Sequence, residues 1–228
     1  MRHIQFTVAL ICATLFFCGS AFAQQKPKAS HNAPAVSVIT PIFSQLVSFN
    51  LPGNFSPSAA FEQADGNAYI QEHVLPGETV DKWTQMLTVT GAKNIVVEHP
   101  EVTPKDFASF LANGFQQACP SSFSGKELYS GKLNGLDTFI MVASCGVAPG
   151  NSRYSEAAVI TSIKGDKDIY TLQWAQRGKP SATPIDINVD MWSNRVKNLM
   201  PIKLCSIVPG EQPPYPSCVG GESKDWTK

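Results

Sequence analysis

Cysteine is the residue type with the clearest chemistry in this sequence. Four cysteines lie after residue 23, at Cys119, Cys145, Cys205 and Cys218. Four cysteines allow three disulfide pairings. The spacing favours Cys119 with Cys145 and Cys205 with Cys218, because each pair encloses a short segment, and each unstrained bridge would stabilise the fold by ~3–4 kcal/mol. No C-x-x-C motif occurs that would indicate a redox or zinc site, so we expect a structural role for all four.

Histidine, the other common metal ligand, is scarce. His31, His73 and His99 are the histidines after residue 23, and no H-x-H or H-E-x-x-H spacing occurs. We expect solvated surface histidines. The segment 186–190, DINVD, superficially resembles the start of a calcium loop, but the sixth position of that loop is methionine instead of glycine and the twelfth is lysine instead of glutamate. The sequence therefore predicts no metal ligands.

Motifs for a catalytic nucleophile are also absent. There is no G-x-S-x-G elbow, and the Gly-Lys pairs at 131–132 and 178–179 lack the glycine spacing of a phosphate loop. A thiol at Cys119 or Cys145 acting with His99 fits the sequence less well than a disulfide, because Cys119-Pro120 ends a predicted helix. We predict no catalytic residues and no cofactor or cofactor-binding residues.

The first 23 residues have the features of a cleavable export signal. Arg2 precedes an apolar run from Phe6 to Cys18, and Ala21-Phe22-Ala23 matches the small-x-small pattern before a cleavage site. A lipid anchor on Cys18 is disfavoured, because Phe17 is large where the lipoprotein peptidase needs a small residue. We expect a periplasmic or secreted protein without membrane insertion after cleavage, since no later segment approaches ~20 apolar residues.

The charge of the chain limits the class of partner. The whole chain has 18 basic and 18 acidic residues, and removal of the signal takes away only Arg2, which leaves a net charge of −1. Such a balance provides no basic field for nucleic acid. We therefore expect no nucleic-acid partner, and an unknown protein or envelope component as the partner.

Composition divides the remaining chain into three parts. Residues 24–41 are polar and rich in proline, alanine and serine, which predicts a flexible leader. Residues 42–202 are patterned throughout and predict a single domain. Residues 203–228 contain three prolines close together and predict an irregular C-terminal tail, which the Cys205–Cys218 pair would hold against the domain.

Two copies of the pattern T-P-x-D predict the starts of two amphipathic helices, at Thr103 and at Thr183. Threonine is a good N-cap, proline suits the first helical position, and an acidic residue favours the first turn. The first helix is expected to present Phe107, Phe110, Leu111, Phe115 and Ala118 on one face, and the second Ile185, Val189, Trp192, Val196 and Leu199. A short helical turn is also expected near 78–83.

Three tight-turn signals, Asp65-Gly66, Asn134-Gly135 and Gly165-Asp166, separate β-like runs. They predict hairpins of 59–64 with 67–74, 125–133 with 136–145, and 156–163 with 168–175, and further strands are expected at 45–51 and 85–90. The expected architecture is therefore α+β, with a mainly antiparallel sheet flanked by two amphipathic helices in an α-β-α sandwich.

This order of elements over residues 42–202 resembles the Mog1/PsbP-like fold group, with the hairpins and the two T-P-x-D helix starts as the matching features. The segment from Gly77 to Gly91 is also similar to uncharacterised exported bacterial proteins. Members of that fold group are mostly accessory or binding proteins, so the resemblance implies a non-catalytic role. It transfers no functional residue to this sequence.

We therefore expect an exported, non-catalytic module that binds a protein or cell-envelope component. The loops 146–155 and 176–183 are the candidate recognition segments, because loops of that length on a rigid sheet are common binding sites. Two alternatives stay open. A secreted hydrolase or effector with a dispersed site would place His73 or His99 beside a carboxylate or a serine in a concave pocket, and a carrier would hold a small apolar ligand in a cavity between sheet and helix.

Overall fold

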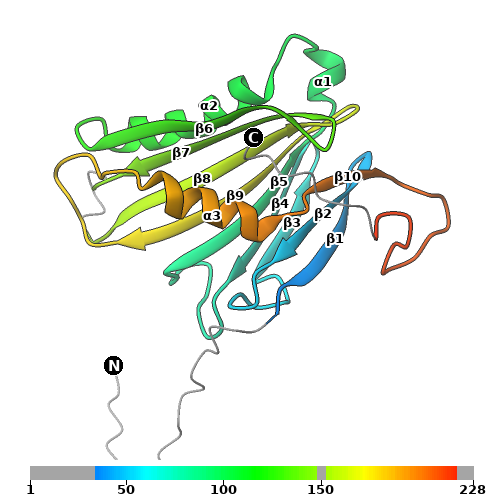
Figure 1. Cartoon of the computed structure of the whole chain (residues 1–228), viewed down its shortest axis with the longest axis horizontal. Helices are drawn as coiled ribbons and strands as arrows, with labels where there is room; N and C mark the ends of the chain where they lie inside the picture. Colours follow the sequence, from blue (N-terminus) through cyan, green and yellow to red (C-terminus); the bar gives the residue numbers. More distant parts are fainter. Residues whose placement is uncertain (1–33, 148–152, 220–228) are drawn as a thin grey trace, which may run out of the picture.

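The computed structural model describes residues 34–147 and 153–219. A seven-stranded antiparallel sheet forms the middle layer, in the order β3-β4-β5-β9-β8-β7-β6 (Figure 1). Its strands in chain order are β3 (Phe61–Asp65), β4 (Ala68–Val74), β5 (Gln85–Ala92), β6 (Phe123–Leu133), β7 (Leu136–Cys145), β8 (Ser155–Lys164) and β9 (Ile169–Gly178). The three predicted hairpins all form, as β3–β4, β6–β7 and β8–β9. Asn134 and Gly135 both have positive φ, as the tight turn between β6 and β7 requires.

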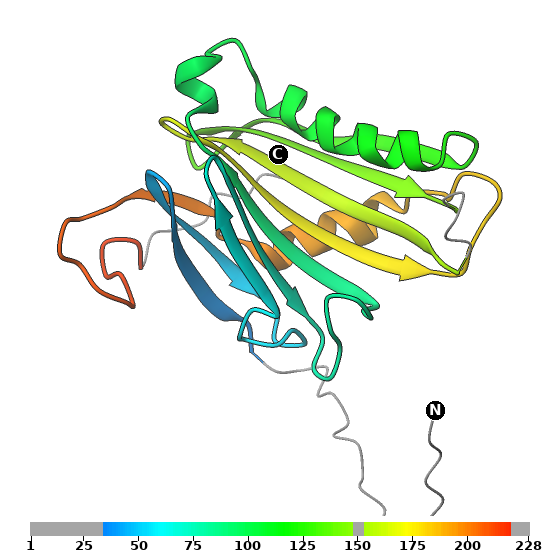
Figure 2. The same cartoon turned by 180° about the vertical axis from the view of Figure 1, so that it is seen from behind.

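Two helices cover opposite faces of this sheet. The helix α2 (Pro104–Ala118) packs on β6, β7 and β8, and α3 (Val189–Leu199) packs on the other face together with β2 (Figures 1 and 2). The α+β class, the mainly antiparallel sheet and the two flanking amphipathic helices are therefore confirmed. A short helix, α1 (Ile95–Glu98), precedes α2 and was not predicted, whereas the helical turn predicted near 78–83 does not form, and residues 80–82 are bends there.

A second sheet lies on the α3 side and changes the expected domain boundaries. It contains β1 (Val36–Ile42), β2 (Gln45–Leu51) and β10 (Lys203–Ser206), in the order β1-β2-β10. The leader predicted for 24–41 therefore ends before β1, and the tail predicted from residue 203 begins with a strand. Both short strands pair with β2, one at each edge, so the backbone groups of this buried strand have hydrogen-bond partners on both sides. Residues 1–33, with the predicted signal, lie outside the described residues.

The main core lies between the two sheets and α3. Phe49 and Leu51 of β2 meet Leu172 and Trp174 of β9 and Val196 of α3, all nearly inaccessible to solvent. Trp174 and Trp192 are buried in this core, and Trp83 is buried in a separate cluster on the outer face of the larger sheet. Burial of an aromatic or aliphatic side chain contributes about 1.5–3 kcal/mol relative to its exposure. This core makes the seven-stranded sheet a rigid base for its outer face, which carries α2.

The two T-P-x-D segments differ in structure. Thr103 caps α2 as predicted: its hydroxyl accepts a hydrogen bond from the Asp106 backbone N–H, and the Asp106 carboxylate accepts one from the Thr103 N–H at 2.9 Å. The second helix begins later than predicted, because Asn188 is its N-cap and accepts a hydrogen bond from the Met191 N–H at 2.9 Å. Residues 179–188 are irregular, so Thr183 is not a helix cap.

The predicted buried face of α2 is partly wrong. Beyond Pro104 at its start, the buried side chains of the helix are Ala108 and Ala112, which pack on Phe139, Ala143 and Ile160 of the sheet. Two alanines four residues apart allow the helix to approach the sheet closely, so the bulky side chains lie at the flanks of the contact. Phe110, expected on the buried face, is 71% exposed.

A buried carboxylate links three segments at one end of the molecule. Asp168, in the turn between β8 and β9, accepts hydrogen bonds from the Ser44 backbone N–H (3.0 Å), the Asn94 backbone N–H (2.7 Å) and the Tyr170 hydroxyl (2.9 Å). The Ser44 hydroxyl donates a fourth, at 2.5 Å. Burial by itself raises the pKa of Asp168, but these hydrogen bonds prevail and hold it below its usual value. The carboxylate thus stays ionised and ties the β1–β2 turn to the sheet.

The structure forms the disulfides Cys119–Cys145 and Cys205–Cys218, which are the pairs favoured by spacing. The first joins the end of α2 to the end of β7. The second joins β10 to the segment after it, which Lys203 also holds through a hydrogen bond from Nζ to the Cys218 carbonyl. Within residues 34–147 and 153–219, no helix is long and apolar enough to cross a membrane.

Candidate functional site

An open groove lies between the C-terminal half of α2 and the outer face of the sheet. Its volume is about 370 Å³. The side chains that line it come from α2, β7, β8, β9 and the residue before β8, and most are apolar: Leu111, Gly114, Phe115, Ala118, Cys145, Tyr154, Glu156 and Gln173. Pockets of this size bind small ligands or a few side chains of a partner. We refer to it as the α2 groove.

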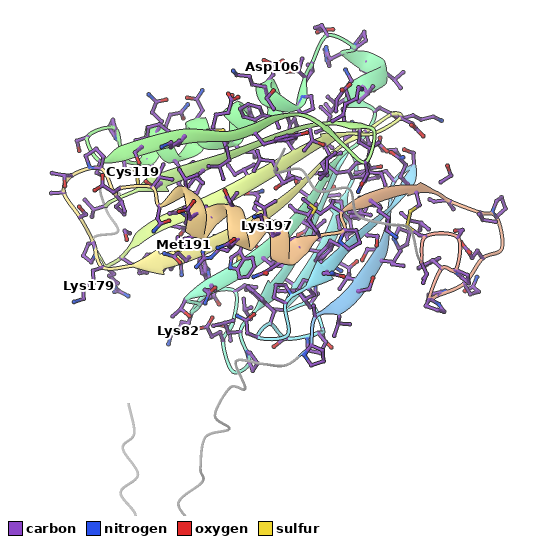
Figure 3. All side chains as sticks on the ribbon, viewed as in Figure 1. Lys82, Asp106, Cys119, Lys179, Met191 and Lys197 are labelled. Carbon is purple, nitrogen blue, oxygen red and sulfur yellow. A yellow bond between two sulfur atoms is a disulfide. The ribbon has the colours of Figure 1, made fainter. Side chains whose placement is uncertain are left out.

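The disulfide Cys119–Cys145 sets the position of the helix over this groove. Cys119 directly follows α2 (Figure 3). Cys145 is the last residue of β7 and one of the lining residues. The N-terminal end of α2 is fixed by its capping box. Because both ends of the helix are held, the width of the groove is set by covalent and hydrogen-bonded contacts.

The apolar surface of the groove continues beyond α2 across the sheet. Phe115 packs against a cluster formed by Trp83, Met86, Ala158 and Ala175 on the outer face. The helix α2 covers β6, β7 and β8, and no helix of the described part of the chain covers most of the outer face of β4 and β5. A bound side chain would therefore contact a continuous apolar base.

Arg177 lies at one end of this apolar surface, stacked between two aromatic rings. The guanidinium carbon of Arg177 lies 3.7 Å from the ring centroid of Trp83 and 4.0 Å from that of Tyr154. Its Nε donates to Glu156 Oε2 at 3.3 Å, and the two residues are direct cross-strand partners of β8 and β9. Cation–π contacts and an ion pair thus hold one side chain in place. The result is a fixed polar group beside an apolar groove.

Glu156 is the charged side chain that lines the groove. Its side chain is 32% exposed and that of Arg177 is 18% exposed. Burial raises the pKa of Glu156 above its usual value, and the attraction and hydrogen bond of Arg177 only partly oppose that effect. Within residues 34–147 and 153–219, Oε1 of Glu156 accepts no hydrogen bond. That oxygen is available to accept a hydrogen bond from a bound group.

The two loops predicted to carry recognition lie together at this end of the molecule. The Ser181 N–H donates to the Gly146 carbonyl at 3.0 Å, and the Val147 N–H donates to Ser122 Oγ at 3.1 Å. A Cβ at Gly146 would lie 2.3 Å from the Ser181 carbonyl oxygen, so only glycine permits this approach. Lys179, in the second loop, and Cys119 lie at the same end (Figure 3). Residues 148–152 of the first loop lie outside the described residues.

The two histidines within the described residues, His73 and His99, do not form the site that a hydrolase would need. His73 is 2% exposed, contrary to the surface position expected, and its ring nitrogens contact the Ser56 carbonyl at 3.1 Å and Gln71 Oε1 at 3.4 Å. Burial lowers the pKa of His73, with the Ser56 contact and the charge of Glu62 opposing that effect, so the ring is neutral at pH 7. His99 faces Glu101 at 3.6 Å, and both side chains are more than half exposed. His31 is outside the described residues.

No cluster of three or more histidine, cysteine, aspartate or glutamate side chains suited to a metal occurs in the described part of the chain. The segment 186–190 precedes and begins α3, where Asn188 serves as a cap. A half-buried arginine, Arg195 of α3, was not anticipated. Its guanidinium lies 4.4 Å from the Trp192 ring centroid and 5.1 Å from that of Trp174, and burial lowers its pKa to about 10.

The sequence predicted the loops beside the α2 groove but not the Glu156–Arg177 pair within it. A signal was present, because the turn at 165–166 sets the register of the hairpin and pairs Glu156 with Arg177. Trp83 and Tyr154 had no comparable signal. They lie in loops far apart in the sequence and meet Arg177 only in the folded chain.

Comparisons with known proteins give one kind of match. No protein-family model matches the chain, and no curated protein matches it. Among solved structures, the chain is similar to the Ran-binding protein Mog1p of Saccharomyces cerevisiae, with 7% identity over 65% of this chain and 87% of that chain and a TM-score of 0.40. This distant similarity falls within the fold group that the element order resembles. Its TM-score is too low to support an argument about function.

Proposed function

We propose that the protein is an exported, non-catalytic module that binds a partner protein of the cell envelope through the α2 groove. The observation that carries the proposal is the combination of an apolar groove with a fixed, half-buried carboxylate, Glu156, at the end of the sheet where the two recognition loops meet. Such combinations of apolar surface with few polar groups are typical of binding sites.

The chemistry of the groove favours an apolar side chain of the partner together with a hydrogen-bond donor. Leu111, Phe115 and Ala118 offer apolar contact, and Glu156 Oε1 can accept from an N–H group. Arg177 already balances the charge of Glu156, so the donor need not be a cation. A volume of about 370 Å³ accommodates one or two large side chains.

Export is supported by two independent features. Residues 1–23 have the pattern of a cleavable signal, and the two disulfides are of the kind that persists in oxidising compartments. Fractionation of the native host tests export: we expect the protein in the periplasm or in the medium, and recovery in the cytoplasm would contradict it.

The proposal can be tested with a photoreactive benzophenone side chain at defined positions of the full chain in its native host. Gln173 lines the groove, and Gln117 is exposed on α2 but does not line it. Illumination should give one recurrent crosslinked protein from position 173 and not from position 117. Equal crosslinking at both positions, or none at position 173, would contradict a binding site in the groove.

The groove would also suit a small apolar ligand, and the same preparation tests this alternative. If native mass spectrometry of the purified protein shows a bound small molecule that is lost in the Gly114→Leu variant, the protein is a carrier. The hydrolase alternative would instead require activity that is lost on substitution of His73 or His99, and neither side chain lines the groove.

A further inference from the structure

The free edges of the two sheets differ in how they are protected. Exposed strand edges invite pairing with another chain, and proteins block them with charges, bulges, short strands or cover. At one edge of the seven-stranded sheet, β6 carries a register shift between Glu127 and Tyr129, and at the other edge β3 has five residues, of which Glu62 and Asp65 are acidic. In the smaller sheet, β10 has four residues and is tied by the Cys205–Cys218 disulfide.

The remaining edge, β1, is protected neither by charge, nor by a bulge, nor by short length. Its seven residues, VSVITPI, carry no charge, and its register with β2 is continuous from Val36 to Ile42. In the part of the chain that the structure describes, no strand pairs with its outer side. Pro41 is the one protective feature, and it affects only the end of the strand.

The backbone of β1 is oriented to accept a further strand. Ile42 and Gln45 flank the two-residue turn of the β1–β2 hairpin and therefore form a hydrogen-bonded pair. Hydrogen-bonded and non-hydrogen-bonded positions alternate along an antiparallel pair, so Ser37 and Ile39 direct their N–H and C=O groups away from β2. Pro41 shares this set of positions, which suits a residue without an N–H.

A groove of about 490 Å³ runs beside these groups. Ile39 of β1 contributes to it, together with Glu62 of β3 and Gln71 of β4 on the larger sheet. Pro213, Pro214 and Tyr215 of the C-terminal segment contribute apolar surface. An extended peptide alongside β1 would therefore contact protein on both of its faces.

The lining of this groove is held in place before any ligand binds. The Tyr69 hydroxyl donates to Glu62 Oε1 at 2.7 Å, which fixes the carboxylate. The C-terminal segment is held by the Cys205–Cys218 disulfide and by Ser217, whose N–H donates to Glu211 Oε1 at 2.8 Å. A preorganised groove reduces the entropy cost of binding.

We propose that β1 binds an extended peptide of a partner protein by strand addition, with a lysine or arginine of the peptide facing Glu62. Glu62 is the charged residue among those that line the groove. An acidic group beside uncharged walls is complementary to a basic side chain. A second copy of this chain fits less well, because its own β1 offers no basic residue to Glu62. This surface is separate from the α2 groove, so each can fail without the other.

The probe for this proposal is the acetylated, amidated pentapeptide TVKVT, titrated to millimolar concentration into the ¹⁵N-labelled mature protein. We expect shifts of the Ser37 and Ile39 amide signals together with slower hydrogen exchange of both. The Ile39→Pro variant removes an outward N–H and keeps the bonds to β2, and should weaken binding at least tenfold. The variant Val38→Thr, at a position directed toward β2, is the matched control and should bind as the wild type does.

A variant that reverses the charge at position 62 provides a second test, which does not depend on whether Ile39→Pro folds. Glu62→Lys should weaken binding of TVKVT about fivefold and make TVEVT the better ligand. The proposal is overturned if the wild-type protein shows no shifts at Ser37 and Ile39, or if both peptides bind Glu62→Lys and wild type equally. A concentration-dependent dimer that Ile39→Pro abolishes would show that the occupant is a second copy, which also overturns it.

Discussion

Substitution of the buried carboxylate Asp168 by asparagine should destabilise the protein by about 2–4 kcal/mol. The carboxylate accepts four hydrogen bonds, two from the Ser44 N–H and hydroxyl, one from the Asn94 N–H and one from the Tyr170 hydroxyl. An amide has a single accepting oxygen, so at least one buried donor must face an NH₂ group. A buried unsatisfied donor costs about 1–3 kcal/mol, and loss of hydrogen bonds to a charged acceptor adds to that cost.

The assay is urea unfolding of the mature protein, followed by tryptophan fluorescence, with Asp166→Asn as the control. Asp166 lies in the same turn but is exposed, and substitution there should change the free energy of unfolding by less than about 0.5 kcal/mol. Equal stability of Asp168→Asn and wild type would refute the reasoning, because it would mean that the hydrogen bonds of Asp168 do not stabilise the fold.

The lowered pKa of Asp168 also predicts that the free energy of unfolding depends on pH. The pKa of Asp168 is lower in the folded protein than in the unfolded chain. The contribution of Asp168 to the free energy of unfolding is therefore complete above the ordinary aspartate pKa near 3.9. It is lost as the pH falls through the lower pKa that Asp168 has in the folded protein. Stability of wild type and Asp168→Asn should converge at acid pH, and a constant difference down to pH 2 would contradict this.

Three further predictions concern α2 and the groove beside it. Thr103→Ala should lower the free energy of unfolding by about 1 kcal/mol through loss of the cap, whereas Thr183→Ala, in the other T-P-x-D segment, should have little effect in the same urea titration. Arg177→Met should raise the pKa of Glu156 further, because burial then acts without the opposing charge of the guanidinium. A ¹³C NMR titration of the Glu156 carboxyl carbon measures this pKa, and an unchanged value would contradict the ion pair. Replacement of both cysteines of the disulfide at the end of α2 by serine should cost ~3–4 kcal/mol in thermal or urea unfolding, and a loss below 1 kcal/mol would contradict a structural role.

The sequence predicted the elements whose signals are local. Gly66, Asn134 and Gly165 lie in the turns of the hairpins that form, and Thr103 begins the helix that it was expected to begin. These signals work because turn and cap residues act through their own backbone conformation and hydrogen bonds. The same chemistry was misleading at Thr183, where Asn188 supplies a competing cap closer to the apolar repeat.

Features that depend on tertiary contacts were missed. The strands β1 and β10 are short or contain proline, and they form because the buried strand β2 needs partners on both sides. The hydrophobic periodicity of α2 predicted that Phe110 lies on the buried face. In the structure the helix packs on the sheet through the small side chains of Ala108 and Ala112 instead. The Arg177 stack joins two loops and a strand end, and only the fold brings them together.

Gly114 offers the most direct test of binding in the α2 groove. A Cβ at this position has no atom within 4 Å, so a side chain fits without strain. Gly114→Ala and Gly114→Leu should both stabilise the helix by about 0.5–1 kcal/mol, but only leucine fills the groove. With the partner identified by crosslinking at position 173, the affinity measured by calorimetry should be unchanged for Gly114→Ala and reduced at least tenfold for Gly114→Leu. Equal affinities of the two variants would contradict the proposed site.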